Sequence, residues 1–178
     1  MRSLSKFFYL LGVMLIFSSA YLVWQRHTPT RLSFDTTSVG EGSHVSLLNS
    51  PSRIRIERLN IDLPIIGADL EQGKWQATDR GVSYLTSTAL PGEMGNSVLY
   101  GHNWPNLLGR LVNIKPGDLI EIQSSDGSLR RFRVAYTTTV TPDQTHILAQ
   151  TNDARLTIYT CSGFLDSKRF VATAILEQ

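Results

Sequence analysis

The sequence predicts an all-β domain of the sandwich or small closed-barrel class. From Arg53 onward, short runs of alternating apolar and polar residues dominate, and alternation of this kind is the signature of half-buried strands. Turns that contain Gly or Pro separate these runs, such as Pro91-Gly92 and Pro116-Gly117. About seven short strands within the last ~126 residues are typical of sandwiches and barrels.

The predicted strands cover 53–56, 61–65, 97–100, 118–122, 131–136, 155–159 and 170–176. Asp126-Gly127 lies between two of these runs and predicts a tight hairpin, because such turns need residues that tolerate positive φ. Residues 104–112 offer a short helix, with Pro105 suited to its first turn. The sequence contains no internal repeat.

Composition narrows the function classes. The 178 residues allow one ordinary domain with an appendage, and 42% apolar content excludes a disordered chain. A single cysteine, Cys161, excludes an intrachain disulfide and a zinc site built on two or more thiolates. The basic surplus lies near the amino terminus, since 13 basic and 15 acidic residues follow from Leu32 onward. We therefore expect no nucleic-acid partner.

Residues 1–25 are predicted to form a membrane anchor. The stretch 7–24 holds 18 uncharged residues, which as a helix would span about 27 Å, close to the ~30 Å hydrocarbon core. A cleaved signal peptide, processed near Ser18-Ser19-Ala20, and a buried core helix are the alternatives. Basic residues flank both ends, so charge alone favours a cytoplasmic amino terminus only slightly.

Residues 26–52 are rich in Ser, Thr, Gly and Pro and are predicted to be a flexible tether between the anchor and the domain at 53–178. The apolar patch 45–48 is expected to pack back on the domain.

Cys161 and His102 are candidates for nucleophile and base. Cys161 follows a predicted strand and precedes Ser162-Gly163, so it is expected where a strand gives way to a loop. A reactive cysteine needs a nearby base or cation to form its thiolate. Among four histidines, His102 ends a strand-like run after Gly101, which places its imidazole at a rim. The alternatives are an inert buried thiol and a loop histidine that only forms hydrogen bonds.

Arg169 is the third candidate, eight residues after Cys161 and at the start of the last predicted strand. Across a hairpin it could reach the cysteine with a permanent charge and a five-donor fork. The alternative is a solvated surface arginine, of which the neighbouring Lys168 is the example.

Four motifs resemble the sortase family, and they follow one another along the chain in the family's order. The run 157–161, TIYTC, is similar to the sortase signature Thr-Leu-x-Thr-Cys, with Ile158 in place of Leu. The segment PGEMGN followed by YGH, over 91–102, resembles the part of a sortase that carries its catalytic histidine. The stretch that follows resembles the family in GRL at 109–111 and KPGD at 115–118. Arg169 falls where the family has its active-site arginine, and the whole resemblance covers 53–178.

The resemblance implies a closed sortase β-barrel of about eight strands with one or two short helices. It implies a membrane-anchored cysteine transpeptidase on the outer face of the cell membrane. Cys161 would form a thioester with the sorting motif of a secreted protein, and a cell-surface amine on a wall precursor or pilin-like protein would then accept the acyl group. His102 would act as acid and then base, and Arg169 would hold the oxyanion. Thr160 and Gly101 are weaker candidates for substrate binding. No cofactor and no metal are expected.

Other interpretations remain open. The tether lacks the Asp-Pro-aromatic element that pilin-building sortases use as a lid, which disfavours that subclass. Residues 139–153 occupy the place of the loop that reads the sorting motif, where His146 is a candidate contact or a solvated residue. A cysteine hydrolase without acyl transfer and a non-catalytic tethered β-barrel are the alternative functions. An L,D-transpeptidase is disfavoured, because Tyr159 stands where its histidine would be.

Overall fold

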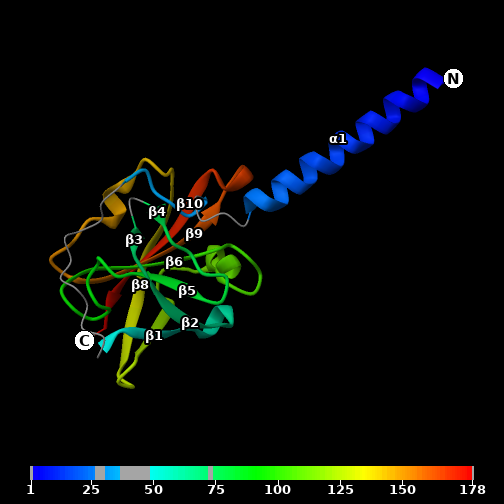
Figure 1. The fold of residues 1–178 in the computed structure, drawn as a ribbon. Coiled ribbons are helices and arrows are strands. Elements are labelled where there is room, and N and C mark those ends of the chain that lie inside the picture. Colours follow the sequence, from blue (N-terminus) through cyan, green and yellow to red (C-terminus); the bar gives the residue numbers. More distant parts are fainter. Residues whose placement is uncertain (1, 27–30, 37–48, 72–73, 178) are drawn as a thin grey trace.

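The computed structural model describes residues 2–26, 31–36, 49–71 and 74–177. Its body is a closed barrel of eight strands, so the predicted all-β class is confirmed in its barrel form (Figure 1). Around the barrel the strands follow the order β1-β2-β5-β6-β9-β10-β8-β7. Their bounds are β1 Pro51–Ile56, β2 Ile61–Ala68, β5 Val82–Leu85, β6 Gly95–Gly101, β7 Leu119–Ser124, β8 Leu129–Val140, β9 Ala154–Ser162 and β10 Lys168–Leu176.

Two of the strand pairs are parallel, β2 with β5 and β6 with β9, and the others are antiparallel. The predicted hairpin at Asp126-Gly127 joins β7 to β8. There Gly127 has φ 84°, and the Asp126 Oδ1 accepts a hydrogen bond from the Ser128 amide at 2.8 Å. The parallel pairing of β6 with β9 is the pairing that positions the candidate site.

Short elements complete the fold. A two-stranded ribbon consists of β3 (Leu70–Glu71) and β4 (Lys74–Trp75). Among the described residues, 3₁₀ helices lie in the loops as η3 Glu57–Leu59, η4 Leu108–Asn113, η5 Thr145–Leu148 and η6 Phe164–Asp166. The helix expected over 104–112 is therefore present as the 3₁₀ helix η4, which begins later than predicted.

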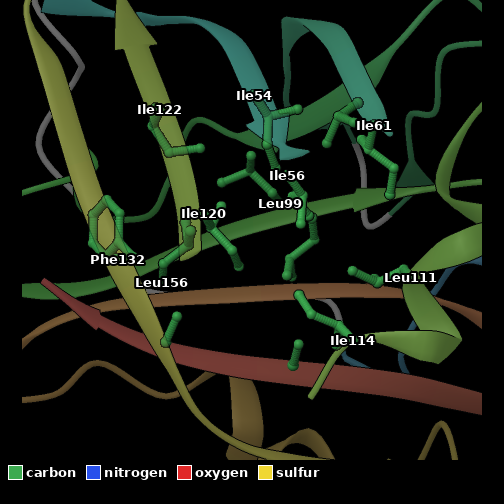
Figure 2. Packing of buried hydrophobic residues seen from close by; sticks show 14 of the residues in the cluster. Ile54, Ile56, Ile61, Leu99, Leu111, Ile114, Ile120, Ile122, Phe132 and Leu156 are labelled. Carbon is green, nitrogen blue, oxygen red and sulfur yellow. The ribbon is translucent and has the colours of Figure 1, made fainter. Parts of the chain in front are cut away.

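The barrel interior is filled by aliphatic side chains that alternate along the strands (Figure 2). Ile54 and Ile56 of β1 and Ile120 and Ile122 of β7 meet there, and none of them is exposed to solvent. Phe132 of β8 closes the same cluster. Burial of these apolar surfaces is the main favourable term for a fold of this kind.

The helix α1 (Arg2–Arg26) lies outside the barrel, with its apolar side chains exposed (Figure 1). Over 6–24 it is long and apolar enough to cross a bilayer, judged by length and composition only. The patch 45–48, expected to pack on the domain, lies outside the described residues.

Candidate active site

Cys161 and Arg169 come from neighbouring antiparallel strands. Cys161 is the second-to-last residue of β9, and Arg169 is the second residue of β10. The register of the two strands places Arg169 directly opposite Cys161. Directly opposite residues project from the same face of a sheet, so both side chains lie on the outer face of the barrel wall. Lys168, one position earlier, is exposed, whereas Arg169 is only 3% exposed.

His102 follows β6, the parallel neighbour of β9. Gly101, the last residue of β6, is paired with Thr160 of β9. His102 directly follows Gly101 and Cys161 directly follows Thr160, so the two residues lie at the same level of the sheet. The Thr160 hydroxyl donates a hydrogen bond of 2.8 Å to the Gly101 carbonyl. His102 is buried, and its ring stacks on Trp104 with centroids 4.4 Å apart. The fold thus brings His102, Cys161 and Arg169 to one end of β6, β9 and β10.

Thr160 and Gly101 connect the two strands that carry the candidate nucleophile and base. Thr160 has no exposed surface, and its hydroxyl is engaged by Gly101. This contact joins the end of β6 to β9 beside Cys161. Their binding of substrate stays a prediction.

A second apolar cluster, which we call the outer cluster, covers this face of the wall. Its buried members are Leu32, Phe34, Ala68, Trp75, Leu85, Val98, Tyr100, Val140, Leu148, Tyr159, Cys161 and Val171. At its centre Tyr100 and Tyr159 stack with ring centroids 5.4 Å apart, and Trp75 meets Tyr100 edge-on at 5.3 Å. The candidate nucleophile is therefore embedded in an aromatic patch outside the main core.

The segment Arg31–Thr36, which we call the strap, lies across this cluster and across the site. The Cys161 Sγ donates a hydrogen bond of 2.8 Å to the Arg31 carbonyl, and the Tyr159 hydroxyl donates one of 3.1 Å to the Leu32 carbonyl. The Phe34 ring packs edge-on against Tyr159 at 5.0 Å. In Figure 1 the strap follows α1 in the chain and crosses the side of the barrel that carries β4, β9 and β10.

Both ends of the strap are held by loops of the barrel. At one end the Arg31 guanidinium forms an ion pair with Asp166 of η6. At the other, the Asp35 amide donates a 2.9 Å hydrogen bond to the Pro142 carbonyl, which lies in the loop between β8 and β9. Residues 31–36 belong to the predicted tether, yet they are packed against the barrel. In this position the strap covers the sulfur, and Cys161 is only 2% exposed.

Burial under the strap governs the acidity of the nucleophile. Burial raises the pKa of the Cys161 thiol to about 12, outweighing the positive charge of Arg169, which lowers it. The Asp166 carboxylate raises this pKa further, and Arg31 lowers it. Because the thiolate is the reactive form, the sulfur is held protonated and inert while the strap covers it.

The Arg169 guanidinium donates hydrogen bonds to main-chain carbonyl oxygens. One guanidinium nitrogen, Nη1, donates to the Asp166 carbonyl at 2.9 Å and to the Lys168 carbonyl at 3.0 Å. Nη2 donates to the Ser33 carbonyl of the strap at 2.8 Å. Its Nε is buried without a hydrogen-bond partner among the described residues. The hydrogen bond of Nη2 is thus the one that Arg169 makes to the strap.

The loop between β8 and β9, residues 141–153, borders the site at the far end of the strap. Leu148 of η5 joins the outer cluster. The Asn96 side-chain amide donates to the Ile147 carbonyl at 3.0 Å and to the Ala149 carbonyl at 3.2 Å, which fixes the loop to β6. His146 instead lines a separate cavity of about 480 Å³ along β8, so a contact of His146 with substrate stays a prediction.

Sequence reasoning missed the strap and Asp166. The available signal for the strap was Leu32 and Phe34, two large apolar residues spaced by two within a polar tether, as in a strand with one buried face. Nothing in the pattern around Asp166 indicated its ion pair, because Arg31 is 135 positions away. Among the described residues, no group of three or more His, Cys, Asp or Glu side chains could hold a metal ion.

Comparisons with known proteins agree with this architecture. A family model described as the sortase domain matches residues 54–177. Sortase A of Listeria monocytogenes is 31% identical over 102 residues, which cover 55% of this chain and 45% of that protein. The match thus spans less than half of the length of that relative.

Solved structures of sortases share the fold. The complex of Streptococcus agalactiae sortase C1 with MTSET has a TM-score of 0.61 at 25% identity, covering 71% of this chain and 66% of that one. Listeria monocytogenes sortase A has a TM-score of 0.59 at 25% identity, covering 71% and 86%. Sortase C from Clostridium perfringens has a TM-score of 0.60 at 22% identity, covering 72% and 71%.

Proposed function

Because this chain belongs to the sortase family of cysteine transpeptidases, we propose that it cleaves a sorting motif in secreted proteins and transfers the acyl part to a cell-surface amine. Cys161 is the nucleophile, His102 the acid and base, and Arg169 the oxyanion donor. The observation that carries this proposal is the cross-strand pair of Cys161 and Arg169, with His102 leaving the parallel neighbour strand at the same level.

In the first half-reaction, the Cys161 thiolate attacks the carbonyl carbon of the scissile peptide bond. The negative charge that develops on the carbonyl oxygen is stabilised by the Arg169 guanidinium, and one such donor contributes about 3 kcal/mol in comparable sites. His102, as imidazolium, gives its proton to the departing amine, and the C–N bond breaks. The product is a thioester on Cys161, which divides one difficult amide exchange into two easier steps.

In the second half-reaction, an amine attacks the thioester. His102, now neutral, accepts a proton from the attacking nitrogen as the new C–N bond forms and the sulfur leaves as thiolate. A histidine suits both roles because its ordinary pKa lies near neutrality. A wall precursor or a pilin-like protein would supply the amine.

The location we propose is the cell membrane, crossed once by α1, with the barrel outside the cell. Support comes from the 19-residue apolar span over 6–24 and from the membrane-associated, surface-exposed nature of sortases in general. The partners follow from this location: secreted proteins as acyl donors and envelope amines as acceptors.

The test uses the full-length chain in detergent with a library of fluorogenic peptides, comparing wild type with Cys161→Ala. We expect cleavage and a thioester adduct on Cys161 in wild type, and neither in the variant. Ser162→Ala, one position along the chain, is the matched control and should retain cleavage. Cleavage that survives Cys161→Ala contradicts the proposal.

The alternative is hydrolysis without transfer. Product analysis with and without triglycine separates the two reactions, because a transpeptidase joins the acyl peptide to the added amine. A protein that forms no adduct with any peptide is a non-catalytic binding module instead.

A further inference from the structure

The carboxylate of Asp166 connects the strap to the loop that carries His102. Its Oδ2 forms the ion pair with the Arg31 guanidinium, and its Oδ1 accepts a hydrogen bond of 3.2 Å from the Asn103 side-chain amide. Asn103 directly follows His102 in the chain. The cation that pairs with Asp166 beside the candidate site therefore comes from the chain itself.

The loop that presents Asp166 has an unusual backbone. Leu165 and Asp166 have φ values of 51° and 60°, in the left-handed region that non-glycine residues rarely adopt. Gly163, with φ 77°, begins the loop, and the Asp166 carbonyl is held by the Arg169 Nη1 at 2.9 Å. Such conformations persist where the surrounding structure enforces them, and they cluster at functional sites. The backbone that carries Asp166 is thus held by its own loop and by Arg169, and not only by the strap.

The main chain at Arg31 has to move before a substrate can reach Cys161. The Arg31 carbonyl oxygen lies 2.8 Å from the Cys161 Sγ, in the space that a scissile carbonyl must enter. When the strap leaves, Asp166 loses the guanidinium but keeps Asn103. In the described conformation Arg169 contacts the Asp166 main-chain oxygen and not the carboxylate. The Asp166 side chain is 13% exposed with Arg31 in place, and a carboxylate that has lost its cation favours binding another one.

We propose that Asp166 binds the ammonium group of the amine acceptor, with the Arg31 guanidinium as its intramolecular stand-in. This inference rests on the proposed transpeptidation. The acceptor binds Asp166 as an ammonium ion and releases one proton to water. The free amine then attacks the thioester carbonyl carbon, His102 takes a second proton from the nitrogen, and the C–S bond breaks to leave the Cys161 thiolate.

The test measures how the thioester divides between amines. Full-length wild type and Asp166→Asn are acylated with a peptide that forms the Cys161 thioester, and two nucleophiles are titrated. Triglycine carries an ammonium group at pH 7.5, whereas hydroxylamine is neutral there. We expect Asp166→Asn to raise the triglycine KM about tenfold, the loss of one charge-assisted hydrogen bond. Hydroxylamine transfer should change less than about twofold, and Asp166→Glu should recover part of the triglycine affinity.

Arg31→Gln is the control for the strap, because it breaks the same ion pair and leaves Asp166 in place. Its triglycine KM should equal or fall below that of wild type. The inference is overturned if Asp166→Asn affects triglycine and hydroxylamine equally, or if it matches Arg31→Gln, since Asp166 then serves only to hold the strap. Absence of any thioester in wild type is a different result, which contradicts the proposed function itself.

Discussion

Cys161 and Arg169 face each other across the β9–β10 ladder, and the strap contacts both of them through main-chain carbonyls. The Arg31 carbonyl accepts from the Cys161 Sγ, and the Ser33 carbonyl accepts from the Arg169 Nη2 at 2.8 Å. The strap therefore engages the sulfur and the guanidinium together, as an extended peptide substrate would have to do. The described conformation therefore covers the site, with Cys161 only 2% exposed.

Breaking the ion pair that holds the strap should activate the thiol. In Arg31→Ala the strap loses its bond to Asp166, and water reaches Cys161 more often. Burial is the largest cause of the raised pKa of Cys161, whereas the opposing charge of Arg31 is the smallest of the four causes. The gain of water therefore outweighs the loss of the Arg31 charge, and this pKa should fall toward its ordinary value of about 9. We expect alkylation by iodoacetamide at pH 7.5 to accelerate at least about tenfold.

A pH series distinguishes this effect from a general loosening of the protein. In wild type the alkylation rate should keep rising toward pH 12, whereas in Arg31→Ala it should level off earlier. Arg53→Ala is the control, because it removes an exposed ion pair with Asp62 far from the site in sequence. Equal alkylation rates in wild type and Arg31→Ala at every pH would contradict the covered state.

The pKa of Cys161 also links stability to pH. Its thiol stays protonated in the folded chain to about pH 12, but ionises near 9 when unfolded. The contribution of this thiol to the free energy of unfolding is therefore complete below pH 9 and is lost as the pH rises toward 12. The free energy of unfolding, measured by urea titration at a series of pH values, should fall more steeply over this window in wild type than in Cys161→Ala. A parallel decline in both proteins would count against the raised pKa.

Phe34 should anchor the strap through its aromatic contacts. Its ring is 3% exposed and packs against Tyr159 and Trp75 with centroids 5.0 and 6.3 Å away. Burial of a phenylalanine side chain contributes about 1.5–3 kcal/mol, so Phe34→Ala should shift the strap toward release by about tenfold or more. Trypsin cleavage of the Arg31–Leu32 bond, followed by mass spectrometry, reports this release.

Phe164 provides the matched control for that experiment. It lies on the neighbouring η6 loop, but its side chain is 85% exposed. Phe164→Ala removes the same ring without breaking a buried contact, and we expect the cleavage rate at Arg31–Leu32 to stay at the wild-type value. If both substitutions accelerate cleavage alike, the strap is not held by its aromatic anchor.

Arg169→Lys tests whether the guanidinium fork is needed. Lysine keeps the charge but cannot donate to three carbonyls from two nitrogens in a fixed plane. We expect thioester formation, measured by mass after acid quench, to slow about 100-fold, since loss of one oxyanion donor has effects of this order. Lys168→Arg, at the exposed neighbouring position, should leave the rate unchanged. If Arg169→Lys formed the thioester at the wild-type rate, Arg169 would not be the oxyanion donor.

Strand alternation made much of this fold predictable, and the exceptions have physical causes. β9 was expected because apolar residues alternate along it, and the same alternation places Tyr159 and Cys161 on one face and Ile158 on the other. β5 escaped prediction because all four of its residues are buried, which removes the alternation. A strand covered on both faces has no polar side to mark its period.

The candidate site was predictable only in part. The order of His102, Cys161 and Arg169 in the motifs was enough to nominate them, and the β6–β9 and β9–β10 registers place them at one end of the wall. The strap was not predictable, because its hydrogen bonds use main-chain carbonyls, which every residue has. Its signal in the sequence is the pair of apolar side chains Leu32 and Phe34, and the patch 45–48 of the same tether is apolar as well.

The parallel junction of β2 and β5 offers a last prediction, on the stability of the barrel itself. Gly81 immediately precedes β5, and a Cβ at this position would lie 2.3 Å from the Pro64 carbonyl oxygen of β2. Main chain cannot move aside as a side chain can, so Gly81→Ala must push the two strands apart. We expect a loss of about 1–3 kcal/mol in the free energy of unfolding, measured by urea titration. In the control Gly67→Ala, the new Cβ meets only the Thr86 methyl at 3.3 Å, and the loss should be smaller because a side chain can adjust. Equal stability of Gly81→Ala and wild type would mean that β2 and β5 are not joined as closely as the register requires.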